Sequence, residues 1–183
     1  MATKTFVSGE VLTASDTNTY LANSGLVYVN SKTFSGSGTV NFTSAFNSTY
    51  DYYKLIMVVT SADAGAQICE SRLLVGSTAT SGGTDYKFYE SGLTWAGGAD
   101  NAAGNGAAYW FIFRSTDYFM GTVEIQNPYT TIYTTYQSAG NDSAQRVQSG
   151  GVHTASTSYD GIQFKVGSGT LTGTIYSYGY RKA

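Results

Sequence analysis

Alternation of apolar and polar positions is the clearest pattern in the chain, and Thr170 to Tyr180 shows it best. In this segment Thr170, Thr172, Thr174, Tyr176, Tyr178 and Tyr180 alternate with Leu171, Gly173, Ile175, Ser177 and Gly179. Side chains of a strand point alternately to opposite faces, so the pattern predicts a strand with a tyrosine-bearing face. The rings either line the interior of the domain or contact a neighbouring subunit. We favour the interior, although the face with Leu171 and Ile175 could equally be the inner one.

Short apolar runs recur from Leu26 onward between clusters of Gly, Ser, Asn, Asp and Thr, without a helical period. This pattern is typical of a sandwich or barrel. Strands are expected at residues 26–34, 38–43, 52–60, 67–75, 85–91, 107–114, 119–126, 131–138, 147–153, 161–166 and 170–180. The expected fold is all-β: an antiparallel, jelly-roll-like β-sandwich over residues 26–183.

Three segments refine this expectation. Residues 52–59, YYKLIMVV, are apolar on both faces apart from Lys54, which predicts a central strand covered on both sides. Pro128 falls in a turn between two strands, where its missing N–H does no harm. The tract from Trp95 to Ala108, rich in Gly, Ala and Asn, predicts a mobile or contact loop.

Residues 1–25 form a separate arm with a different pattern. Thr13 can cap the backbone N–H of Asp16 at the start of a helix from Ala14 to Ala22, with Gly25 as a stop signal. Isolated helices become marginally stable in water only at roughly 12–15 residues, so this helix needs a neighbour. We expect the arm to dock on a larger particle through its apolar side chains: Phe6, Val7, Val11, Leu12, Tyr20 and Leu21.

Composition narrows the function classes. Only 12% of the residues are charged, with 10 basic and 12 acidic side chains, so no basic surface for nucleic acid is expected. Cys69 is the only cysteine, which excludes an intrachain disulfide. The first residues lack the pattern of a secretory signal, and no apolar run is long enough to span a membrane. The chain is expected to be made in a cytoplasm.

Few side chains suit catalysis or metal binding. His153 is the only histidine, so neither a Ser-His-Asp triad nor a zinc site is expected, and we interpret it as structural or exposed. The acidic residues fall mostly in turn contexts, although a glycosidase pair stays open as a third hypothesis. A calcium site at Asp100, Asn101 and Asn105 lacks the spacing of a calcium loop. No cofactor is expected.

An aromatic sugar platform is the other candidate site. Trp95 together with Tyr86, Phe88 and Tyr89 could stack on the apolar faces of sugars, whereas the simpler interpretation is packing within the fold.

Two parts of the chain carry a family resemblance. FVSGEVLTASDTNTYLANSGLVYV, from Phe6 to Val29, resembles the opening of many bacteriophage virion proteins, in which G-x-x-L-T-A-x-D-x-N precedes a β-rich body. VEIQNPY, GGVHTASTSYDGIQF and SGTLTGTIYSYGYRKA are similar to segments of small structural proteins of tailed phages, especially marine and cyanobacterial ones. Such proteins are described as tail fibre, head fibre, minor tail or decoration proteins.

The resemblance implies a non-enzymatic virion protein, and no long stalk precedes the body, which favours a compact decoration or short fibre subunit. Its partners would be copies of itself, as a homotrimer, and other capsid or tail proteins. The alternative is a tail-tip module that binds a host receptor or surface glycan. Candidate contact residues for subunits or receptor are Trp95, Asp100, Asn101, Asn105, Tyr176, Tyr178 and Tyr180.

Overall fold

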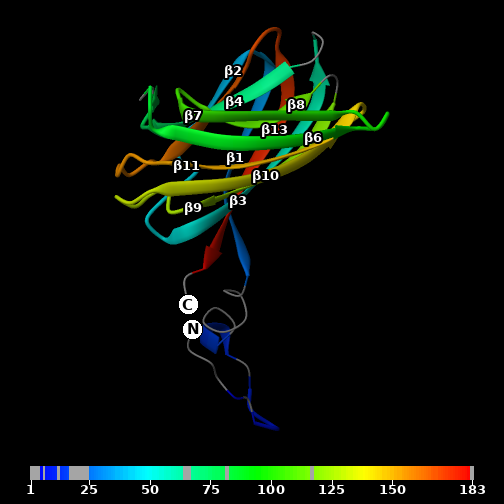
Figure 1. The fold of residues 1–183 in the computed structure, drawn as a ribbon. Coiled ribbons are helices and arrows are strands. Elements are labelled where there is room, and N and C mark those ends of the chain that lie inside the picture. The colour runs from blue at the N-terminus through cyan, green and yellow to red at the C-terminus, as the bar shows by residue number, and fades with distance from the viewer. Residues whose placement is uncertain are drawn as a thin grey trace.

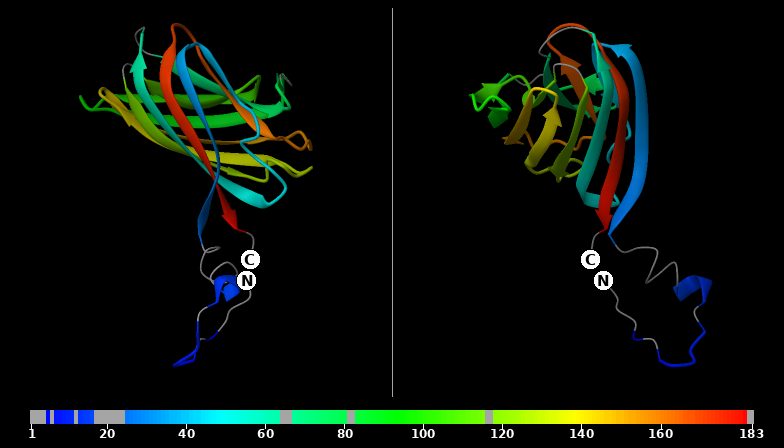
Figure 2. Two further views of the ribbon diagram at one scale, coloured as in Figure 1. Left: turned by 180° about the vertical axis from the view of Figure 1, so that it is seen from behind. Right: turned by 90° about the vertical axis from the view of Figure 1, so that its right-hand side faces the viewer.

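The computed structural model describes residues 5, 7–11, 13–16, 25–63, 67–80, 83–115 and 118–181. Two antiparallel sheets pack face to face, as Figures 1 and 2 show. The large sheet contains, in spatial order, β1 (Leu26–Ser37), β13 (Leu171–Arg181), β3 (Tyr50–Ala62), β9 (Phe119–Gln126), β10 (Thr134–Asp142), β11 (Gln145–His153), β6 (Tyr86–Thr94) and β7 (Ala99–Ala107). The small sheet contains β2 (Thr39–Phe42), β12 (Gly161–Val166), β4 (Gln67–Val75) and β5 (Thr78–Ala79), with β8 (Trp110–Ser115) also paired to β4. The expected β-sandwich is confirmed.

Four nested strand pairs give the sandwich its jelly-roll topology. β1 pairs with β13, β2 with β12, β3 with β9 and β4 with β8. The four pairs are distributed over the two sheets, as expected for a double Greek key. The β10–β11 and β6–β7 hairpins then extend the large sheet beyond β9, and Figure 1 shows them running across the front of the molecule.

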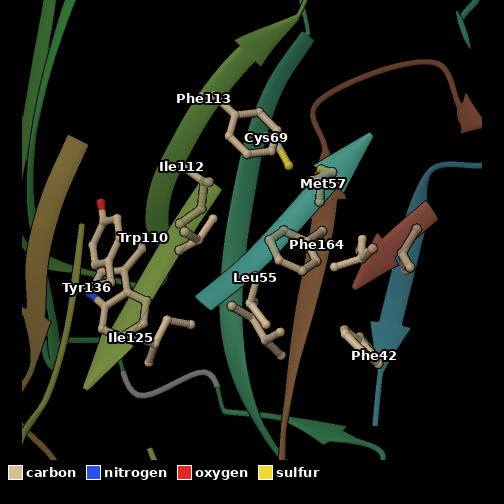
Figure 3. Close-up of a cluster of buried hydrophobic side chains, with 14 of the residues drawn as sticks. Phe42, Leu55, Met57, Cys69, Trp110, Ile112, Phe113, Ile125, Tyr136 and Phe164 are labelled. Carbon is tan, nitrogen blue, oxygen red and sulfur yellow. The ribbon is translucent and has the colours of Figure 1, made fainter. Parts of the chain in front are cut away.

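Large aromatic and aliphatic side chains fill the space between the sheets (Figure 3). Trp110, Tyr53 and Tyr86 are each fully buried, and the Phe113 and Phe119 rings stack with centroids 3.8 Å apart. Each of these residues comes from a strand whose alternation directs it inward. The apolar area that they remove from water stabilises the sandwich.

Hydroxyl groups of the large sheet bind a bulge in β8. The β4–β8 register shifts between Cys69 and Glu70, which leaves the carbonyls around Ile112 outside the regular ladder. Ser138 Oγ donates to the Ile112 carbonyl at 2.7 Å, and Ser149 Oγ contacts the Phe111 carbonyl at 2.8 Å. Tyr136 also donates to the Phe111 carbonyl, at 2.5 Å. These bonds satisfy buried acceptors and tie the two sheets together.

Two expectations about the strands are wrong. Residues 99–107, expected within a loop, form strand β7 against β6, and only residues 95–98 turn between them. The backbone ladder accepts these small residues because an edge strand needs little side-chain packing. β3 is central in the sheet, but its Ile56 and Val58 side chains are only partly covered on the outer face.

Two local expectations are confirmed. The turn containing Pro128 links β9 to β10, and Asn127 before it has a φ of 57°. In the arm, Thr13 Oγ1 accepts from the Asp16 N–H at 3.1 Å, and the Asp16 carboxylate accepts in return from Thr13. The helix is described only as α1 (Ala14–Asp16), and the rest of the expected helix lies outside the described residues.

Candidate functional site

The outer face of the large sheet carries the tyrosines of β13. Leu171, Ile175 and Ser177 point inward and are buried, whereas Tyr176, Tyr178 and Tyr180 are partly exposed on the opposite face. The favoured interpretation, that these rings line the interior, is therefore wrong. Ser177 explains how a polar residue fits inside, since its hydroxyl donates to the buried Ala45 carbonyl at 2.7 Å.

The tyrosines of three adjacent strands form a ring cluster on this face. Tyr180 contacts Tyr52 of β3 with centroids 4.5 Å apart, and Tyr178 contacts Tyr28 of β1 at 5.9 Å, both edge to face. Edge-to-face packing is the favourable geometry for aromatic rings. The cluster is a partly exposed aromatic surface.

A carboxylate joins this cluster to the amide-rich strands beside it. Glu124 of β9 accepts a hydrogen bond from the Tyr52 hydroxyl and forms an ion pair with Lys54 at 3.3 Å. Burial, followed by the bond to Glu124, raises the pKa of the Tyr52 hydroxyl well above its ordinary value. The phenol therefore remains a donor throughout the physiological range, and Lys54 balances the carboxylate charge.

Two overlapping hollows lie next to Glu124, across β9, β10 and β11. The larger has a volume of about 470 Å³ and is lined by Thr122, Glu124, Gln137, Ser138, Ala139, Gln148, Ser149 and Gly150. The second, of about 420 Å³, shares Glu124, Gln137 and Gly150 and reaches Tyr52, Gln126, Thr135, Tyr136 and Gly151. A third hollow adjoins the first at Thr122 and Ala139. The first two form one depression, lined by polar and apolar groups together, and the third, which also reaches Arg146, lies beside it.

Strand register brings these residues together from distant parts of the sequence. Lys54 pairs with Glu124, Glu124 with Gln137, Gln137 with Gly150, and Gly150 with Tyr89. All five therefore lie in one row across five strands of the outer face. The alternation of each strand identifies its outer residues and places Gln148 and Gly150 on one face, but no sequence signal places Gln137 beside them.

The expected aromatic platform around Trp95 is divided between two faces. Trp95 and Tyr89 are 63% and 59% exposed, whereas Tyr86 is fully buried and contacts His153. Phe88 is partly covered and stacks near Phe111. Trp95 Nε1 donates to the Asp142 carbonyl at 3.3 Å, so its ring lies at the β10–β11 turn. Of these four rings, only those of Trp95 and Tyr89 are exposed enough to contact a ligand.

The Asp100, Asn101 and Asn105 group lies along edge strand β7. Asn101 and Asn105 are exposed and four residues apart, which in a strand is about 13 Å. Two amides at that separation do not share an ion. Within the described ranges no group of three or more His, Cys, Asp or Glu side chains could hold a metal.

His153 lies in the core, in agreement with its interpretation as structural. Tyr159 OH is 3.2 Å from its Nδ1, and the Tyr86 and Trp110 rings pack around it. Burial lowers the pKa of His153 below its ordinary value, which favours the neutral ring. Its second nitrogen has no hydrogen-bond partner among the described residues.

Several acidic residues stabilise turns, as their sequence contexts predict. The Asp142 carboxylate accepts from the N–H groups of Ala144 and Gln145, and Asp160 accepts from the Gly76 N–H. Asp63 accepts two bonds from Thr170, which lower the pKa of its carboxyl. These carboxylates hold backbone groups in place at separate turns.

The arm is described only in part. Val7 and Val11 are 68% and 80% exposed. The other expected docking residues, Phe6, Leu12, Tyr20 and Leu21, lie outside the described residues. Leu26 pairs with Tyr180, so β1 begins beside the end of β13. Figure 2 shows both at the end of the sandwich that is nearer to the arm.

Comparison of the chain with protein-family models, with curated proteins and with solved structures gives no match. Within the described part of the chain, no helix has both the length and the apolar character to cross a membrane.

Proposed function

We propose that this chain is a non-enzymatic bacteriophage virion subunit that docks through residues 1–25 and displays the jelly-roll sandwich. The observation that carries the proposal is the exposure of Val7 and Val11 in a segment that the sandwich does not cover. Burying each valine against a partner would contribute up to about 1.5–3 kcal/mol. The resemblance of Phe6 to Val29 to the opening of phage virion proteins supports the same role.

The fold is compatible with this role. Jelly rolls recur in viral capsid domains and in lectins, and this support is an analogy at the level of fold. The proposed assembly is a homotrimer within a virion, made in the host cytoplasm, in which three arms on one particle would add avidity.

Incorporation into particles tests the docking role. A double variant, Val7→Asp with Val11→Asp, is expected to lose incorporation while keeping the melting temperature of the native chain, because neither side chain packs on the sandwich. Val75→Asp is the matched control, since Val75 is an exposed valine at the end of β4. Normal incorporation of the double variant would contradict the proposal, and light scattering on the purified chain tests the trimer.

A second candidate function is recognition of a host receptor or surface glycan. The exposed Trp95 and Tyr89 rings favour it, as does the depression on the same sheet, where Tyr89 pairs with Gly150. Both functions are compatible in one chain, since the arm and the outer face of the large sheet are separate surfaces.

A further inference from the structure

We propose that the depression on β9, β10 and β11 binds a neutral oligosaccharide, with Gln137 and Gln148 as its hydrogen-bonding residues and Gly150 as its floor. The proposal deepens the second candidate function above and rests on it. It moves the ligand site from the Trp95 turn, where the sequence suggests it, to the middle of the sheet.

The amides provide the first argument. Gln137 and Gln148 are exposed, line the larger hollow, and make no hydrogen bond to any part of the chain that the structure describes. Each amide offers two donors and an acceptor. A sugar ring presents adjacent hydroxyls that both donate and accept, so it can use both kinds of group. Thr122 adds a further hydroxyl to the same lining.

The shape of the floor provides the second argument. Gly150 lies on the outer face between Gln137 and Tyr89, where every other outer position of this row bears a side chain. A Cβ at Gly150 would meet only ordinary contacts, the nearest being the Tyr136 carbonyl oxygen at 3.4 Å. The fold therefore does not require glycine for space at this position, and its effect is to keep the depression open.

Charge indicates a neutral ligand. Glu124 is the one acidic group lining either of the two overlapping hollows, and it is already paired with Lys54 and bonded to Tyr52. An anionic sugar would meet this carboxylate, and a cationic ligand would compete with Lys54. A neutral chain of hydroxyls leaves the pair intact.

Aromatic rings mark the two ends of the site. Tyr52 lines the second hollow, and Tyr89 is the neighbour of Gly150 on β6. The strands that carry the two rings, β3 and β6, lie four strand spacings apart, or about 19 Å, which suits an oligosaccharide rather than a single sugar. Both rings can stack on sugar faces.

A second copy of this chain fits the same face less well. The cores of protein interfaces are depleted in charged residues and rich in aromatic and apolar groups. Here the centre of the face holds an ion pair and glutamines, and the apolar tyrosines lie to one side, on β1, β13 and β3.

A printed array of neutral and acidic oligosaccharides, including bacterial surface polysaccharide fragments, tests the proposal with the full chain. Neutral sugars are expected to bind. Calorimetry with the best-bound neutral sugar should then show a loss of about tenfold or more for Gly150→Val and for Gln137→Ala combined with Gln148→Ala. Thr39→Ala, which removes an exposed hydroxyl from β2 of the small sheet, is the control and should change affinity by less than about twofold.

Three different results would each overturn the proposal. Binding that survives Gly150→Val but is lost in Trp95→Ala would place the site at the turn and overturn the proposal. Absence of neutral sugar binding would also overturn it, as would a change in oligomeric state caused by Gly150→Val and detected by light scattering. The melting temperature of Gly150→Val shows whether the fold is kept. None of these results affects the incorporation test, so the docking role is decided independently.

Discussion

The two faces of the large sheet use the same strands in opposite ways. On the inner face, the hydroxyls of Ser138 and Ser149 bind the carbonyls of the β8 bulge. On the outer face, one residue away along the same strands, the amides of Gln137 and Gln148 have no partner among the described residues. Inner polar groups are needed by the fold, because a buried polar group without a partner is costly. Outer polar groups remain available to a ligand.

The two tryptophans provide the sharpest test of this difference. Trp110 is fully buried against Tyr86, Tyr136 and His153, so Trp110→Ala is expected to lower the free energy of unfolding by about 3–5 kcal/mol. Trp95→Ala, on the exposed turn, should cost no more than about 1 kcal/mol. Urea denaturation measures both, and equal losses would contradict the assignment of the two faces.

Two consecutive glycines, Gly150 and Gly151, test the same difference between the two faces of the large sheet at the level of the backbone. A Cβ at Gly151 would lie 2.0 Å from the Lys87 carbonyl oxygen, whereas one at Gly150 has room. Gly151→Ala is expected to cost about 1–3 kcal/mol or more, because backbone must shift. Gly150→Ala should stay within about 0.5 kcal/mol of the native chain. The difference between the two melting temperatures is the measurement, and its absence would contradict the register of β11.

The hydroxyl contacts to β8 are expected to contribute less. Ser149→Ala removes bonds to the Phe111 and Ile112 carbonyls and should cost about 1–3 kcal/mol. Ser91→Ala, on the exposed outer face of β6, is the control and should be nearly neutral. Equal effects in a denaturant titration would show that the bulge does not need the serine.

Low pH should lower the stability of the folded chain, because it favours protonation of His153, which is buried in the core. Its pKa is lowered in the folded chain, so the unfolded chain binds a proton more readily, and stability is lost as pH falls below about 6.5. In His153→Gln, the loss of melting temperature between pH 7 and pH 5 should be smaller than in the native chain. An unchanged pH profile would contradict the buried neutral ring.

The outer ion pair should have the smallest effect on stability. Lys54 and Glu124 are about one third exposed, so Glu124→Gln is expected to change stability by no more than about 1 kcal/mol. Burial, the largest cause of the raised pKa of the Tyr52 hydroxyl, remains in this variant, but the bond to Glu124 is lost, so that pKa should fall part of the way toward its ordinary value. Ultraviolet titration of the tyrosines detects that shift, with Lys54→Met as a control that keeps the carboxylate.

Local features of the fold, and the outer face of β9 within the candidate site, could be predicted from the sequence. The cap at Thr13, the turn at Pro128 and the paired faces of β9 depend on near neighbours, and local patterns identify them. The sequence does not predict strand β7, because glycine, alanine and asparagine have low strand propensity and pairing with β6 holds them extended. It also does not decide the inner face of β13, because Leu171 and Ile175 compete with three tyrosines as core residues.

The sequence by itself determined that the chain forms a β-sandwich and which residues share a face, because strand alternation repeats every two residues and needs no partner. Only the tertiary structure decided which face is buried and which strands are neighbours. Glu124, Gln137, Gly150 and Tyr89 come from four strands, and their row exists through long-range pairing in one register. A shift of one residue in any of these pairings would turn that strand's side chains to the other face and remove the depression.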